Sequence, residues 1–194
     1  TLLNLAANDA VCMPLLNKKD LADLICAADM LPYRTSQLAV GSGLNIVKQN
    51  FQICMSPPKS GIFWDLGREL EQLLYRAFGE LKPPLLLEKF QINDIVIQRY
   101  AAGSSGISAH RDHLKYRGLI CLILLSGTGR FYICKDRLQS NKTEVLWAPG
   151  SILLMRAPGL ENCDERPFHF LTDITTKRYS IGLRYNSRLA PDFV

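Results

Sequence analysis

Residues 90–134 read FQINDIVIQRYAAGSSGISAHRDHLKYRGLICLILLSGTGRFYIC. Short runs of β-branched, aromatic and other apolar residues alternate in this stretch with turns such as Gly103-Ser104-Ser105-Gly106 and Gly127-Thr128-Gly129. Runs of this composition and length, bounded by Gly and Ser, are typical of β-strands. The stretch therefore predicts four strands, at Phe90–Tyr100, Ser108–Asp112, Leu119–Ser126 and Arg130–Cys134.

The residues after this stretch continue the strand pattern, whereas those before it have helical spacing. Apolar residues recur at helical intervals after Asn17, which can cap a helix, and again over Asp65–Phe78, where Gly79 marks the end. Helices followed by about eight strands predict an α+β fold, a double-sheet jelly roll with the N-terminal helices packed on one sheet. The four later strands are expected at Glu144–Trp147, Ser151–Arg156, Phe168–Ile174 and Tyr179–Tyr185.

The composition of the 194 residues fits a single domain. A hydrophobic content of 47% can form a core and excludes a disordered segment, while 13 glycines and 10 prolines exclude a collagen-like repeat. We expect one domain over 1–194, with a helical part over about 1–85 and a jelly-roll core over about 86–190.

Charge and cysteine usage indicate the cellular compartment of the protein and the kinds of ligand that it can bind. No apolar run is long enough to cross a membrane, and the first residues lack the basic stretch of a signal peptide. The six cysteines are widely spaced without a Cys-x-x-Cys, so we expect reduced thiols and a cytoplasmic protein. The formal net charge of +5 permits an anionic substrate or nucleic acid without requiring either. The oligomeric state stays open.

The chain has only three histidines, and their placement indicates a metal site. On a strand, His110 and Asp112 would share one face and His113 would point away, while His169 lies in a later predicted strand. Two imidazoles and one carboxylate can bind a metal at three points and leave open positions, which suits Fe(II) oxygen chemistry. Two alternatives are a zinc site and histidines that are only hydrogen-bonded, partly buried residues.

The segment 177–185 has one polar and one apolar face if it is extended. Its polar face places two small residues between two arginines: Arg178, Ser180, Gly182 and Arg184. Turned inward, this face would form a narrow polar trench for a small dianion, because an arginine pairs bidentately with a carboxylate. Turned outward, it would be an ordinary solvent-facing edge.

With these residues the sequence resembles the Fe(II)/2-oxoglutarate-dependent dioxygenase superfamily over roughly Asp94–Asn186. The strand, glycine turn and His-x-Asp at 99–112 resemble those of prolyl hydroxylases and AlkB-type demethylases. The spacing from His169 to Arg178 resembles that of prolyl hydroxylases, and the pair Arg178 and Arg184 resembles that of AlkB-type enzymes. The turn Pro149-Gly150-Ser151 resembles the one that often precedes the distal histidine.

This resemblance implies a double-stranded β-helix core and a role for each site residue. His110, Asp112 and His169 would hold Fe(II). Arg178 would pair with the remote carboxylate of the cosubstrate 2-oxoglutarate, and Tyr100 could add a hydrogen bond. The reaction would use O2, release succinate and CO2, and hydroxylate a C–H bond of a small molecule or a peptide side chain. Arg184 would either contact the other end of the cosubstrate or brace the site.

Two other functions remain open at this point. One is an AlkB-like oxidative demethylase of nucleic acid, although Gln98 stands where AlkB-type enzymes usually have Asn. That function needs an aromatic platform for a flipped base. The other is a non-enzymatic jelly-roll module that binds a metal. Aromatic candidates for the platform, each also an ordinary packing residue, are Tyr33, Phe51, Phe63, Trp64 and Trp147.

A run of basic residues directly follows the His-x-Asp. Arg111, Lys115 and Arg117 could line the mouth of the site and recognise an acidic group of the substrate. The alternative is a solvated charge run without a ligand. The substrate itself is not identified by the sequence.

Overall fold

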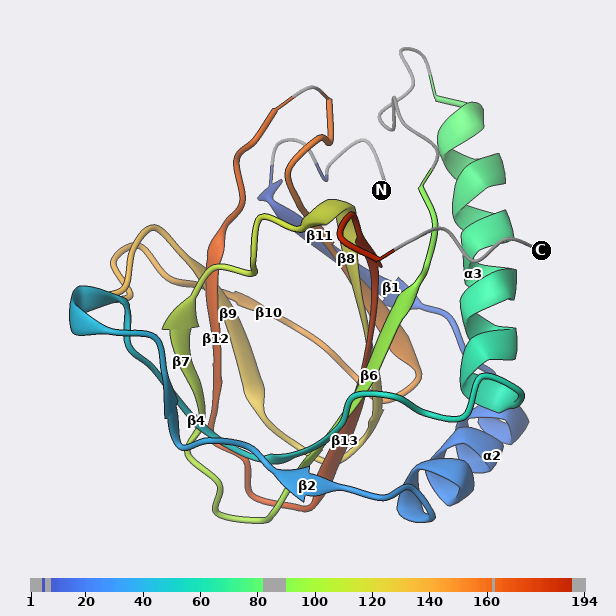
Figure 1. Ribbon diagram of the computed structural model, residues 1–194, viewed down its shortest axis with the longest axis horizontal. Coiled ribbons are helices and arrows are strands. Elements are labelled where there is room, and N and C mark those ends of the chain that lie inside the picture. The colour runs from blue at the N-terminus through green and yellow to red at the C-terminus, as the bar shows by residue number, and fades with distance from the viewer. Residues whose placement is uncertain (1–4, 6–7, 82–89, 162, 190–194) are drawn as a thin grey trace.

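The computed structural model describes residues 5, 8–81, 90–161 and 163–189, and within them two antiparallel sheets face each other (Figure 1). The sheet that we call the major sheet has seven strands, and the minor sheet has six. The strands of the major sheet, in spatial order, are β1 (Ala10–Pro14), β11 (Ser151–Arg156), β8 (Tyr116–Ser126), β13 (Arg178–Asn186), β6 (Asp94–Tyr100), β5 (Gln52–Cys54) and β2 (Arg34–Thr35). Those of the minor sheet are β10 (Thr143–Val145), β9 (Arg130–Cys134), β12 (Phe168–Thr172), β7 (Gly106–His110), β4 (Val47–Asn50) and β3 (Ala39–Val40).

Two helices, α2 (Lys18–Asp29) and α3 (Ile62–Gly79), cover the outer face of the major sheet (Figure 1). The Asn17 side chain caps α2 by accepting a hydrogen bond from the backbone N–H of Asp20 at 2.9 Å. The apolar stripe of α3 packs into the same buried cluster as the outward side chains of the sheet, as its spacing predicts. The α+β jelly-roll fold is confirmed.

Strand β8 lies between two apolar cores. Leu119, Cys121 and Ile123 belong to the cluster beneath the helices, whereas Ile120 belongs to the cluster between the two sheets. Both faces of β8 are therefore buried, which is why Leu119–Leu125 is apolar at every position instead of alternating. The second cluster fills the space between the sheets and surrounds the site described below.

The N-terminal part is less purely helical than its sequence pattern predicts. Besides the two helices it contains five strands, β1 to β5, and a 3₁₀ turn at Gly43–Asn45. These strands have two to five residues each, too few for a period-two pattern to stand out from chance. The expected boundary near 85 falls within 82–89, outside the described residues. The eight later strands are confirmed within a few residues.

The turn into β7 depends on glycine. Gly106 has a φ of 75°, and a Cβ at this position would lie 2.0 Å from the carbonyl oxygen of Leu171 on β12. Only glycine lets the two backbones approach so closely. This contact fixes β7 against β12, the two strands that carry the histidines.

The helices and the cysteines relate to the expectations about membrane spans and disulfides. Neither helix in the described part of the chain is long and apolar enough to cross a membrane. All six cysteines are free thiols.

Candidate metal centre

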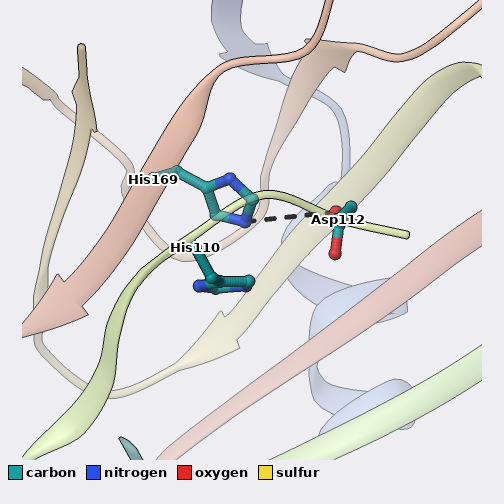
Figure 2. A group of neighbouring side chains, drawn as sticks. All are labelled: His110, Asp112 and His169. Atoms are coloured by element: carbon teal, nitrogen blue, oxygen red, sulfur yellow. Dashed lines mark ion pairs between the residues drawn. The ribbon is translucent and has the colours of Figure 1, made fainter. Parts of the chain in front are cut away.

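The side chains of His110, Asp112 and His169 converge between the two sheets (Figure 2). Their possible ligand atoms all lie within 4.8 Å of one another, and His169 Nε2 is 4.0 Å from Asp112 Oδ2. His110 and His169 are direct partners across the antiparallel pair β7–β12. Three donors at this spacing can bind one metal ion from one side and leave its other positions open.

A β-bulge brings His110 into this arrangement. His110 pairs with His169, and the next pair is Ile107 with Leu171. The interval between these two pairs is therefore three residues on β7 but two on β12. As a result Ile107 and His110 both face the space between the sheets. Strand β7 also ends at His110, so Asp112 reaches the site from the connection after the strand. The predicted convergence of His110 and Asp112 is present, but it does not come from simple alternation along a strand.

Backbone contacts orient both imidazoles. The Nδ1 of His110 lies 2.8 Å from the carbonyl oxygen of Ser108, and the Nδ1 of His169 lies 3.4 Å from that of Pro167. A carbonyl oxygen only accepts, so each Nδ1 carries a proton, and in the neutral ring this tautomer leaves a lone pair on Nε2 for a metal. Burial, with a further contribution from the neighbouring His110, lowers the pKa of His169 to about 4. His169 is therefore neutral near pH 7, as a metal ligand must be.

The carboxyl group of Asp112 is held ionised. Burial alone would raise its pKa, but the electrostatic interactions with His169, His110, Arg184 and Arg166 together outweigh burial and lower it. Arg166 also donates a hydrogen bond from Nη1 to the backbone carbonyl of Asp112. This contact fastens the connection on which Asp112 lies, and no local sequence pattern indicates it.

Arg178 is a buried guanidinium without a counter-charge. Its side chain is 1% exposed, and Nη1 donates to Ser180 Oγ at 3.1 Å. Its Nε and Nη2 have no hydrogen-bond partner, and no described carboxylate pairs with it. Its Cζ lies 4.6 Å from the ring centre of Trp147 and 5.6 Å from that of Tyr100. Burial lowers the pKa of Arg178 to about 10, so it is still charged near pH 7.

Arg184, six residues further along β13, already has a carboxylate partner. Its Nη2 lies 2.9 Å from Asp94 Oδ1 on the neighbouring strand β6, and its Cζ lies 4.2 Å from the ring centre of Tyr116. Asn186 donates a second hydrogen bond to the same carboxylate. Of the two predicted roles for Arg184, this geometry favours bracing the site.

One small cavity of about 70 Å³ joins the triad to the two arginines. The triad forms one wall of this cavity, and the inward face of β13 forms the opposite wall with Arg178, Ser180, Gly182 and Arg184. Gly182 keeps the space open, since a Cβ there would already lie 3.2 Å from Val96 Cγ2. The remaining lining residues are Val96, Gln98, Tyr100, Ile107, Leu122, Phe131, Trp147 and Leu171.

The three basic candidates after the His-x-Asp do not line this cavity. Arg117 pairs with Asp164 at 3.3 Å, and Lys115 lies over the ring of Tyr116. Arg111 is exposed and lies over the ring of Phe168. They are therefore not part of the metal cavity itself.

Two aromatic walls of the cavity were not predicted in their present roles. The Phe131 ring lies against that of His169, with the ring centres 5.6 Å apart, and Trp147 lies against Arg178. Trp147 lies in the connection between β10 and β11, close to the Pro149-Gly150 turn. This turn is the sequence feature that could have indicated where Trp147 lies.

The residues present fit the groups that the sequence predicts. Two imidazoles and an ionised carboxylate are an Fe(II) donor set, and the unpaired buried guanidinium favours an anion in the same cavity. A small molecule that carries a carboxylate at one end and chelates the metal at the other would satisfy both.

Comparisons with known proteins agree on the fold. No protein-family model matches the chain, and no curated protein sequence does so significantly. A prolyl hydroxylase from Trichoplax adhaerens, solved in complex with a hypoxia inducible factor oxygen degradation domain peptide fragment, superposes with a TM-score of 0.70 at 16% identity, covering 95% of this chain and 86% of that one.

Two further structures have the same architecture. A Pseudomonas putida prolyl-4-hydroxylase gives a TM-score of 0.67 at 14% identity, covering 94% of this chain and 95% of that one. HygX from Streptomyces hygroscopicus, solved with nickel, 2-oxoglutarate and hygromycin B, gives 0.65 at 11% identity, covering 100% of this chain and 88% of that one. These similarities establish the fold.

Proposed function

We propose that this chain, whose fold is that of the Fe(II)- and 2-oxoglutarate-dependent oxygenases, is itself such an enzyme. It would hydroxylate a C–H bond of a small molecule or a peptide side chain and release succinate and CO2. The neighbours support both substrate classes, since one was solved with a peptide fragment and another with hygromycin B.

The unpaired guanidinium of Arg178 carries this proposal. A buried cation without a counter-charge is costly, and a metal site alone gives no reason for one. Its Nε and Nη2 are left without protein partners in the cavity that holds the triad. A dicarboxylate bound at the triad would supply the missing negative charge, which a zinc site or a metal-binding module would not.

The chain's own residues divide the work of such a reaction. Arg178 would bind the remote carboxylate of 2-oxoglutarate, and Tyr100, buried beside it, would contact the same end. The neutral His169 and the ionised Asp112 can bind the metal without first losing a proton. Phe131 and Trp147 line the cavity and would limit the access of water. When bound, Fe(II) supplies dioxygen activation coupled to decarboxylation of the cosubstrate.

The test is an anaerobic titration of the metal-free protein with Fe(II) and then with 2-oxoglutarate, followed by visible absorption. We expect a metal-to-ligand charge-transfer band that needs both additions. The band should weaken strongly in Arg178→Ala and Asp112→Ala. Succinate formation that requires dioxygen would then establish turnover.

The opposite results would also be informative. Folded protein that gives no band with both additions would contradict the proposal and favour a non-enzymatic metal-binding module. An equally strong band in Arg178→Ala would mean that the cosubstrate is held elsewhere. The AlkB-like demethylase stays a prediction. It requires salt-sensitive binding of a single-stranded oligonucleotide, which the hydroxylase does not.

A further inference from the structure

Two arginines lie over one aromatic ring close to the metal ligands, and a third lines the same surface groove as that ring. They are Arg111, Arg137 and Arg166, which we call the rim arginines, and the ring is that of Phe168. We infer that the rim arginines bind an anionic group, a carboxylate or a phosphate, of the substrate. This inference rests on the proposed function and specifies that the substrate of that reaction carries a negative charge.

The chain connectivity places the rim arginines next to the triad. Arg111 stands between two of the proposed ligands, and Phe168 directly precedes the third. Arg166 donates to the backbone carbonyl of Asp112. Arg111, Arg166 and Phe168 line a surface groove of about 520 Å³, and Arg137 lies over the same ring without lining the groove. The groove thus reaches Arg111, the residue between His110 and Asp112.

The guanidinium groups are held in place by contacts that do not neutralise them. The Cζ atoms of Arg111 and Arg137 lie 4.2 and 5.6 Å from the ring centre of Phe168. Arg137 also donates to the carbonyl oxygen of Ala109 and to the Asn45 side chain, each at 3.3 Å. Both acceptors are uncharged, so these contacts orient Arg137 and leave its charge uncompensated.

None of the rim arginines forms an ion pair with a described carboxylate. Arg111 and Arg166 line the same groove, and the carboxylate with which Arg166 interacts electrostatically is that of the proposed metal ligand Asp112. Like charges in one groove repel each other, and a bound anion would offset this repulsion.

The acidic residues of the same groove do not supply that counter-charge. Asp164 pairs with Arg117 at 3.3 Å, while Asp9 and Glu165 each lie 3.6 Å from Arg156. These carboxylates are engaged by two other arginines. Among the basic residues that line the groove, Arg111, Arg166 and Lys135 have no ion pair with a described carboxylate.

The ligand of the rim arginines is distinct from the cosubstrate. The remote carboxylate of 2-oxoglutarate has its own partner in the buried Arg178, inside the cavity between the sheets. None of the rim arginines lines that cavity. An anion in the surface groove belongs to a second molecule, which in the proposed reaction is the substrate.

The test uses inorganic sulfate as the probe, with protein loaded with Zn(II) and 2-oxoglutarate so that Arg178 is already occupied. Sulfate is titrated while the arginine Nε–H signals are followed by NMR. We expect the signals of the three rim arginines to shift with one common dissociation constant. In Arg111→Gln and in Arg137→Gln that constant should rise about ten-fold. Arg76→Gln, an equal charge change on the exposed face of α3, should leave it unchanged.

The same variants test whether the anion site binds the substrate during turnover. For a substrate that raises succinate release, Arg137→Gln should increase the Michaelis constant of that substrate about ten-fold and leave that of the cosubstrate unchanged. Sulfate shifts that survive both substitutions, or that weaken equally in Arg76→Gln, would overturn the inference. So would a substrate whose Michaelis constant is unaffected. If the charge-transfer band forms but sulfate does not bind, only this inference fails; if the band is absent, the proposed function fails.

Discussion

At the scale of single residues, Arg178 and Arg184 show that two arginines of one strand face can have opposite energetic roles. Arg178 is buried without a carboxylate, whereas Arg184 is paired with Asp94. Because burial lowers the pKa of Arg178, the folded state disfavours the charged form of this side chain. Arg178 therefore destabilises the ligand-free protein below about pH 10.

Arg178→Met should stabilise the ligand-free protein and abolish cosubstrate binding. We expect the free energy of unfolding to rise by about 1 kcal/mol, because an uncompensated buried charge is replaced by an apolar side chain of similar length. Urea unfolding measures this change, and the charge-transfer band measures binding. Arg184→Met is the matched control and should instead lose about 2 kcal/mol, since it leaves the largely buried Asp94 carboxylate without its cationic partner. A loss of stability in both variants would contradict the assignment of Arg178.

His113 and His169 should differ in their effect on iron. His169 is a member of the triad, but His113 is exposed and its Nδ1 accepts a hydrogen bond from the backbone of Lys115. We expect His113→Ala to keep the iron affinity within about two-fold, and His169→Ala to lower it about 100-fold. Anaerobic titration of Fe(II) against a competing chelator measures both. Equal losses would mean that the ligand set is wrong.

At the scale of elements, strand β13 joins the site to the helical layer. Its inward face lines the cavity, while Tyr179 on the other face reaches Asp29 at the end of α2. Asp29 accepts hydrogen bonds from both Tyr179 and Lys177. These hydrogen bonds, that of Lys177 first, hold the pKa of Asp29 below its usual value. The strand end that carries Arg178 is thus fastened to a helix.

This contact predicts a pH-dependent stability. The lowered pKa means that Asp29 stabilises the folded protein above its unfolded pKa of about 3.8, and that this contribution is lost as pH falls through the lowered value. Asp29→Asn should therefore be less stable than the unmodified chain by a constant amount between about pH 5 and 8, and the difference should shrink towards pH 3. Urea unfolding across pH tests this. Asp23→Asn, which removes a pair with Lys19 on the same helix, is the control for a surface carboxylate. A difference that does not change with pH would contradict the prediction.

At the scale of the whole molecule, the apolar cluster beneath the helices and the metal site lie on opposite faces of the major sheet. The helices and the outer face of the sheet form one apolar cluster, and the cavity lies between the sheets within another. Substitutions beneath the helices should therefore affect folding without changing the site (Figure 1).

Leu70→Ala should lower the stability of the fold without changing the metal site. Leu70 is 3% exposed beneath α3, and its truncation should lower the free energy of unfolding by about 3 kcal/mol. The charge-transfer band per folded molecule should stay the same. Leu73, three residues along the same helix, is 43% exposed, so Leu73→Ala should cost no more than about 1 kcal/mol. A weaker band in folded Leu70→Ala would mean that the helical layer positions the site.

The sequence predicted the elements with strong local patterns. The stripe of α3, the Asn17 cap and the eight later strands are each encoded within a few consecutive residues, so periodicity and turn residues were enough to find them. The five N-terminal strands were missed, because strands of two to five residues are defined by their partners rather than by their own pattern.

By itself the sequence determined the residue types of the centre: two histidines, one aspartate and a strand face with two arginines. Only the tertiary structure decided which arginine is free, since the partner of Arg184 is Asp94, ninety residues earlier on a neighbouring strand. It also decided that Asp112 enters the site from beyond the end of β7, past a bulge that alternation cannot predict. Charge compensation and backbone register depend on which segments meet in space, and local sequence patterns do not contain that information.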